Sequence, residues 1–159
     1  MKALDIAKYY LSKDSKRKLF NDNIIVKNDV KSYEGNIRIN KYLFLTQFVY
    51  LAKYGKKLFD EDFVAYVNGP VIKEIVVDYQ FLKKTNDNVN LSSDICSFLD
   101  KIYTSLENAS CEELIEITHE DPEWIRLSSK TYDAPVMKLE KNIEIYKKRY
   151  KGLIEALKI

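Results

Sequence analysis

The feature that most constrains the fold is the stretch from Tyr42 to Ala52, in which Thr46 and Gln47 are the only polar residues. A segment that is apolar on every side is either a helix enclosed by other helices or a membrane span. Because a span needs about 20 apolar residues, this stretch is too short to cross a bilayer. Gly55 suits a left-handed helix end. The sequence therefore predicts one central buried helix over about 40–54.

Further segments have the spacing of helices, with apolar residues at intervals of three and four. Several have capping residues at their starts, because side-chain oxygens of Ser, Asn and Asp accept hydrogen bonds from the first free amides. The predicted caps are Asn36 or Asn40, Ser92 or Ser93, the capping box of Ser110 with Glu113, and Asp121 before Pro122. Segments with helical spacing lie at about 2–13, 40–54, 70–84, 92–106, 110–119 and 136–158, with a short helical stretch after Asp121 and a polar loop at 85–90.

The β element is predicted to be small. The β-branched run from Ile24 is followed by the turn residues Asn28 and Asp29, which predicts a hairpin over 23–34. A strand is expected over 63–67. We expect Asn68-Gly69-Pro70 to end that strand, with Pro70 as the first helical residue. The predicted fold class is mainly α: a compact domain over 1–159 of about six helices with a small antiparallel β element.

The last predicted helix carries an apolar seam of nearly three heptads. Two interpretations stay open: the helix packs onto its own domain, or the seam joins two copies in a homodimer. Glu144 and Lys148 are placed as a charged pair on this helix. The seam consists of Leu139, Ile143, Tyr146, Tyr150, Leu153 and Leu157.

Composition excludes some functions and leaves others open. The net charge of +2 is too small to argue for nucleic acid, and the basic clusters at 16–18 and 147–151 also suit solvated helix faces. Cys96 and Cys111 have no metal-ligand spacing, and the start of the chain lacks a signal-peptide pattern, so we expect free thiols and a cytoplasmic protein. The familiar nucleotide, protease and hydrolase signatures are absent from the sequence. We therefore expect no catalytic residues, no metal, no cofactor and no enzymatic activity.

A few residues stand out as candidate contacts. His119, the single histidine, either completes a helix end, contacts a partner or acts as a base. Gln47 either satisfies its amide inside the core or binds a ligand. The turn at Asn68-Gly69-Pro70 is either a structural corner or part of a contact surface. Between Glu107 and Glu123 lie seven acids and no Lys or Arg, which indicates a solvated face or, as the alternative, paired carboxylates or metal ligands.

These motifs together resemble the Panacea antitoxin domain, also called SocA-like or GepA-like, over roughly residues 1–127. The chain departs from the family pattern at Asn40, Phe44, Tyr66 and Glu123, and the segment over 16–36 is longer than the usual link. The matching residues are Lys41, Gln47, Gly69, Pro70, Val71, Thr118, His119 and Trp124.

The resemblance implies a non-enzymatic antitoxin that binds and neutralises a cognate toxin, usually encoded beside it. SocA-like members can also act as adaptors that deliver the toxin to a ClpXP-type protease, and members occur in phages and mobile elements. The alternative is a nucleic-acid-binding regulator of phage or mobile-element origin that uses the basic clusters. For the antitoxin, the expected partner-binding residues are Lys41, Gln47, Tyr66, Asn68, Gly69, Pro70, His119 and Trp124, with the acidic stretch facing a basic toxin.

Overall fold

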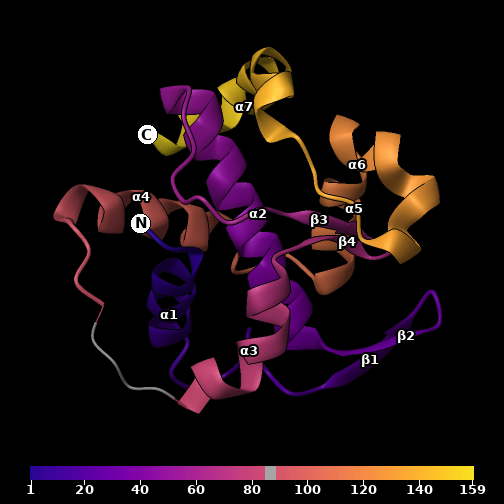
Figure 1. Ribbon diagram of the computed structural model, residues 1–159. Helices are drawn as coiled ribbons and strands as arrows, with labels where there is room; N and C mark the ends of the chain where they lie inside the picture. Colours follow the sequence, from indigo (N-terminus) through magenta and orange to yellow (C-terminus); the bar gives the residue numbers. More distant parts are fainter. Residues whose placement is uncertain (85–88) are drawn as a thin grey trace.

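A computed structural model describes residues 1–84 and 89–159, and in these residues the chain forms seven α-helices, two 3-10 segments and two antiparallel strand pairs (Figure 1). The prediction of a mainly α fold is confirmed, with seven helices instead of about six. The elements are α1 (Ala3–Lys13), β1 (Ile24–Lys27), β2 (Val30–Tyr33), α2 (Glu34–Tyr54), β3 (Val64–Tyr66), β4 (Gly69–Val71), α3 (Lys73–Lys84), α4 (Ser93–Leu106), α5 (Cys111–His119), α6 (Pro122–Leu127), η1 (Ser128–Asp133), η2 (Leu139–Asn142) and α7 (Ile143–Leu157).

Helix α2 runs through the middle of the molecule, as the sequence predicts (Figure 1). Every residue from Ile37 to Val49 is buried, because other elements pack around the whole circumference of the helix. It ends at Gly55, whose φ of 71° is left-handed and whose amide donates to Leu51 O at 2.8 Å. Its start differs from the prediction.

The helix begins at Glu34, directly after β2, with Tyr33 in the N-cap position and no side-chain cap. Asn36 and Asn40 therefore lie inside α2 and cap nothing at its start. The prediction placed the start too late because the apolar pattern becomes continuous only after Lys41, while the first two turns bury polar side chains.

Aromatic side chains from several elements pack against α2. Tyr42 meets Tyr10 of α1 with ring centroids 5.6 Å apart, and Phe48 meets Tyr146 of α7 at 4.5 Å. Tyr146 and Tyr150 are buried, so the predicted seam of the last helix packs onto its own chain. Of the two interpretations of the seam, the structure confirms the intramolecular one.

The predicted helix over 70–84 is partly wrong. Residues Gly69–Val71 form β4, which pairs with β3 in a hairpin whose register places Tyr66 opposite Gly69, and α3 begins only at Lys73. An Asn-Gly pair after a β-rich run is also a hairpin signal, and proline is tolerated in an edge strand because its nitrogen, which has no hydrogen to donate, can face away from the ladder. The hairpin signal therefore outweighed the helix-start signal of Pro70.

The predicted last helix over 136–158 also begins later than expected. Residues 135–137 are extended and bind the free edge of β3: Ala65 donates to Pro135 O at 2.9 Å, and Met137 donates to Phe63 O at 2.9 Å. This pairing satisfies backbone groups of β3 that a helix at 136 would leave open. Helix α7 begins at Ile143 after η2, and its Glu144 pairs with Lys147 in place of Lys148.

The other local predictions are confirmed where the structure describes them. The hairpin β1–β2 forms, with Asn28 and Asp29 at positive φ in its turn. Ser92, the Ser110–Glu113 capping box and Asp121 cap their helices. Of the predicted loop over 85–90, residues 85–88 lie outside the described residues. In the described part of the chain, no helix has the length and apolar character needed to cross a membrane.

Candidate partner-binding site

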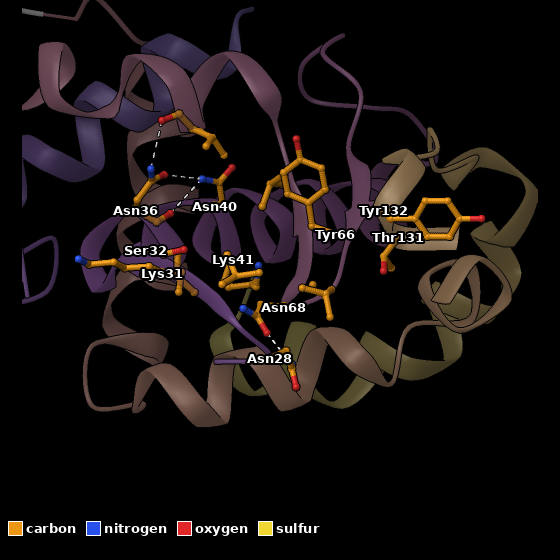
Figure 2. Close-up of a pocket in the computed structure, with 16 residues that line it drawn as sticks. Asn28, Lys31, Ser32, Asn36, Asn40, Lys41, Tyr66, Asn68, Thr131 and Tyr132 are labelled. Atoms are coloured by element: carbon orange, nitrogen blue, oxygen red, sulfur yellow. Dashed lines mark hydrogen bonds between the residues drawn. The ribbon is translucent and has the colours of Figure 1, made fainter. Parts of the chain in front are cut away.

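A cavity of about 630 Å³ lies where the hairpin β1–β2, the first turns of α2 and the β3–β4 corner meet (Figure 2). The start of α2 forms its floor, the hairpin forms one wall, and η1 contributes Tyr132, which is 84% exposed at the mouth. The lining residues are Asn28, Val30, Lys31, Ser32, Asn36, Ile37, Asn40, Lys41, Tyr66, Val67, Asn68, Gly69, Val71, Val76, Thr131 and Tyr132. Mostly apolar walls with a few polar groups are typical of a binding cavity.

Two asparagines on successive turns of α2 tie the floor of the cavity to α3. Asn40 donates through Nδ2 to Asn36 O at 2.9 Å and accepts, through Oδ1, the amide of Ile72 at 2.9 Å. Asn36 in turn donates to Val76 O at 3.1 Å, and Figure 2 shows this ladder beside Lys41. The start of α3 is therefore held in place by side chains of α2, since Asn40 satisfies the amide of Ile72 just before the helix and Asn36 binds the Val76 carbonyl in its first turns.

Lys41 lies under the β3–β4 corner. Its side chain is buried, and its Nζ donates to Pro70 O at 3.0 Å. Gly69 has a φ of 106°, and a Cβ at this position would lie 2.5 Å from Thr118 Oγ1 and 2.8 Å from Lys41 Cε. Glycine is thus required both by the backbone angle and by the close approach of α2 and α5. Burial lowers the pKa of Lys41 to about 7, because the interior disfavours the charged ammonium.

The corner is also fixed from the other sides. Asn68 donates to Lys27 O at 3.0 Å and accepts from Asn28 Nδ2 at 2.8 Å, so it joins the corner to the β1–β2 turn. Trp124 donates through Nε1 to Tyr66 O at 2.8 Å. The His119 ring stacks on Trp124, with centroids 3.9 Å apart and the planes inclined by 14°. Burial, with the nearby Lys41 as a lesser cause, lowers the pKa of His119, so this ring favours the neutral form.

Seven of the eight residues expected to bind a partner therefore lie together. Lys41, Tyr66, Asn68, Gly69, Pro70, His119 and Trp124 form one connected set around the corner. Gln47 lies apart from them. It is fully buried, accepts the amide of Leu58 at 2.7 Å and donates to Phe59 O at 2.7 Å, as in the structural interpretation of this residue.

Most acids of the stretch from Glu107 to Glu123 are engaged within the chain. Glu112 contacts Lys27, Glu113 completes its capping box, and Glu120 pairs with Arg149 at 3.3 Å. Asp121 caps α6 from a buried position, and buried Glu123 binds Arg126 at 2.6 Å. These contacts reduce the charge that the stretch offers to a partner. In the described residues no cluster of three His, Cys, Asp or Glu side chains is placed to hold a metal ion.

Comparison with known families decides the relationship of the chain. A model of the family described as "Antitoxin SocA-like, Panacea domain" matches residues 39–125, which is more than half of the chain. The chain belongs to this family. The resemblance found in the sequence is thus confirmed, and the family description supports an antitoxin in general terms. No curated protein and no solved structure matches the chain.

The match to the Panacea family includes the corner and excludes several other parts of the cavity. Lys41, the β3–β4 corner and the His119–Trp124 pair lie inside the matched residues. Helix α1, the hairpin β1–β2, the first turn of α2, η1 and α7 lie outside them. The cavity therefore combines a family element, the corner, with a hairpin, a helix start and η1 that the family model does not include.

Sequence reasoning missed several residues of the cavity. Asn40 was considered as a cap, although the argument applied to Gln47, that a polar side chain on a buried helix must find partners, applies to it equally. Asn36 could have been found by the same signal. Tyr132 and Lys31 carry no local signal, because their place at the cavity depends on how η1 and the hairpin fold back onto α2.

Proposed function

We propose that this chain is an antitoxin that binds a cognate protein toxin and neutralises it in the cytoplasm. The observation that carries the proposal is the connected set of residues around the β3–β4 corner, beside an open cavity, in a chain of the SocA-like Panacea family. Two tyrosines line the cavity, and tyrosine is among the residue types that dominate binding energy in protein interfaces.

The partner surface in this proposal is the mouth of the cavity. Two tyrosines from different elements line it: Tyr66 at the β3–β4 corner and Tyr132 on η1 (Figure 2). Trp124 and His119 stabilise the corner. Trp124 donates a hydrogen bond to the carbonyl of Tyr66, and the His119 ring stacks on Trp124. Gly69 and Pro70 shape the corner and place Lys41 beneath it. In this proposal Gln47 acts indirectly, by fixing the helix that carries Lys41.

The experiment uses the gene beside this one as the candidate toxin. Cells that express the neighbouring protein alone should stop growing, and cells that also express this chain should grow and yield a complex in a pull-down. Tyr66→Ala combined with Tyr132→Ala should abolish rescue and co-purification while the helical circular dichroism spectrum persists. The matched control is Tyr54→Ala, which removes a half-exposed tyrosine at the far end of α2.

The outcomes separate the parts of the proposal. A neighbour that is harmless, or toxic despite this chain, refutes the antitoxin function for that pair. Full rescue by the double variant would place the partner surface elsewhere on the molecule.

Neutralisation can proceed by occlusion or by delivery to a ClpXP-type protease. The toxin's half-life distinguishes the two in cells with and without that protease. A toxin that is degraded faster in the presence of this chain, and only when the protease is present, supports delivery. An unchanged half-life with full rescue supports occlusion.

A further inference from the structure

The cavity carries positive charge without an acid to balance it. Lys41 lies at its floor and Lys31 at its rim, and among the described residues no aspartate or glutamate lines it. The remaining polar side chains of the lining are hydroxyls and the amides of asparagines, which carry no charge. An occupant that complements this lining has an anionic group at its inner end and an apolar body.

Lys41 is the centre of this charge. An ammonium has three N–H donors, and in the described part of the chain Lys41 Nζ donates one hydrogen bond, to the carbonyl of Pro70. Buried charges are normally paired, because an isolated ion loses its hydration without compensation. The low pKa of Lys41, about 7, is the consequence of this burial, and an anion placed beside the ammonium would raise it again.

The acids of the elements packed around Lys41 have other partners. Glu34 binds Arg38 Nη2 at 3.1 Å, and Glu112 of α5 contacts Lys27 of the hairpin. Burial raises the pKa of the Cys111 thiol, so it stays neutral and provides no counter-ion. The titratable and charged groups that surround Lys41 are Glu34 and Arg38 on α2, Cys111, Glu112 and His119 on α5, and Lys27 and Lys31 on the hairpin.

The rim of the cavity indicates a protein as the occupant. Tyr132, which is 84% exposed, stands at the mouth, and the half-buried Tyr66 lines the cavity from the corner. Exposed aromatic side chains at a cavity are typical of protein interfaces, in which a central anchor enters a pocket and the rim excludes water.

We propose that the toxin inserts one carboxylate into this cavity, where the Lys41 ammonium binds it, while Tyr66 and Tyr132 pack against the residues around that carboxylate. This inference rests on the proposed antitoxin function and specifies its anchor. The carboxylate comes from an aspartate or glutamate side chain or from the C-terminus of the toxin. Asn68 lies beside Lys41 (Figure 2), and among the described residues its Nδ2 group donates one of its two hydrogens, to Lys27 O, so the second can orient the carboxylate.

The test measures the affinity of the purified neighbouring protein for this chain by calorimetry. Lys41→Met, which keeps the length of the side chain and removes its charge, should weaken binding about 30-fold or more, the usual result of truncating one member of a buried charge pair. Lys53→Met is the matched control, since Lys53 is an exposed lysine on the same helix, and it should leave the affinity unchanged.

Substitutions in the partner identify the carboxylate and do not depend on the folding of this chain. Each Asp→Asn and Glu→Gln variant of the neighbouring protein, and one with an amidated C-terminus, is measured in turn. One of these variants should lose as much affinity as Lys41→Met does. Combining that variant with Lys41→Met should weaken binding no further, as expected for two groups that act as a pair. Loss with the amidated C-terminus alone assigns the anchor to the terminal carboxylate.

The pH dependence provides a separate readout. Binding of a carboxylate should draw a proton onto Lys41, so the affinity of the wild-type chain should fall as the pH rises from about 7 to about 9, and that of Lys41→Met should stay level. If the wild-type chain does not bind the neighbouring protein, the proposed function itself fails. If the wild-type chain binds it and a folded Lys41→Met variant binds it equally well, the anchor is refuted and the antitoxin function stands.

Discussion

The two halves of α2 bury polar side chains in different ways. In the second half, Thr46 donates to Tyr42 O at 2.7 Å and contacts the Tyr10 hydroxyl at 2.6 Å, and both ends of the Gln47 amide bind backbone groups. In the first half, Asn40 is satisfied in the same way, but the equally buried Lys41 makes one hydrogen bond among the described residues and has an open cavity beside it. The comparison separates polar groups that are satisfied inside the protein from one charged group that is not, and the proposed binding role of Lys41 rests on this difference.

The largest expected effect tests the second half of the helix as a purely structural region. Phe48→Ala removes a fully buried ring that contacts Phe44 and Tyr146. It should lower the free energy of unfolding by about 3–5 kcal/mol, because a large cavity remains in the core. Urea denaturation followed by circular dichroism measures the loss. A loss below about 1 kcal/mol would contradict the close packing seen around α2.

The next prediction tests Gln47 as a structural amide. Gln47→Leu replaces the side-chain amide with an apolar group of similar size. The amide of Leu58 and the carbonyl of Phe59 are then left without partners. The loss of stability should be about 2–4 kcal/mol, since each buried unpaired backbone group costs about 1–3 kcal/mol. Gln47→Glu, a variant of the same shape, should also destabilise. If Gln47→Leu is as stable as the wild type and loses partner binding, Gln47 belongs to the contact surface after all.

The smallest expected effect has the opposite sign and sharpens the comparison. Lys41→Met should raise the free energy of unfolding at neutral pH by about 1–2 kcal/mol, because a methionine needs no counter-ion in the interior. With the pKa of Lys41 at about 7 in the folded protein and near 10.5 in the unfolded chain, the unfolded chain holds an extra proton between these values. Wild-type stability should therefore rise with pH across that window, and the rise should be weaker in Lys41→Met.

Urea titrations at several pH values between about 6 and 9 measure both effects. The control Lys53→Met should retain the wild-type slope, since that lysine is exposed at the far end of α2. A destabilised Lys41→Met with an unchanged slope would assign Lys41 a structural role through Pro70. The buried polar side chains of both halves of α2 would then serve the fold.

Much of the fold could be predicted because its signals are local. The apolar run of α2, the Gly55 end, the Ser110–Glu113 capping box and the Asn28-Asp29 turn each depend on neighbouring residues. The errors fall at Pro70 and Pro135, where two local signals compete. In both places the segment became extended because β3 offers backbone partners on both of its edges.

The candidate site was predictable only in part. The residues that match the Panacea family were found by their motif, and the family match over residues 39–125 agrees with them. That Gln47 serves the core and Lys41 faces a cavity could not be read from the sequence, because both are polar residues on the same buried helix.

The sequence by itself determined the central helix, the capped helices around it and the family, since these depend on apolar periodicity, on caps within a few residues of one another and on a motif. The tertiary structure decided which buried polar groups find partners and which face open space. That outcome depends on where the hairpin, the corner and η1 come to rest around α2, and such contacts join residues separated by up to about a hundred positions, as Lys31 and Tyr132 are at one cavity.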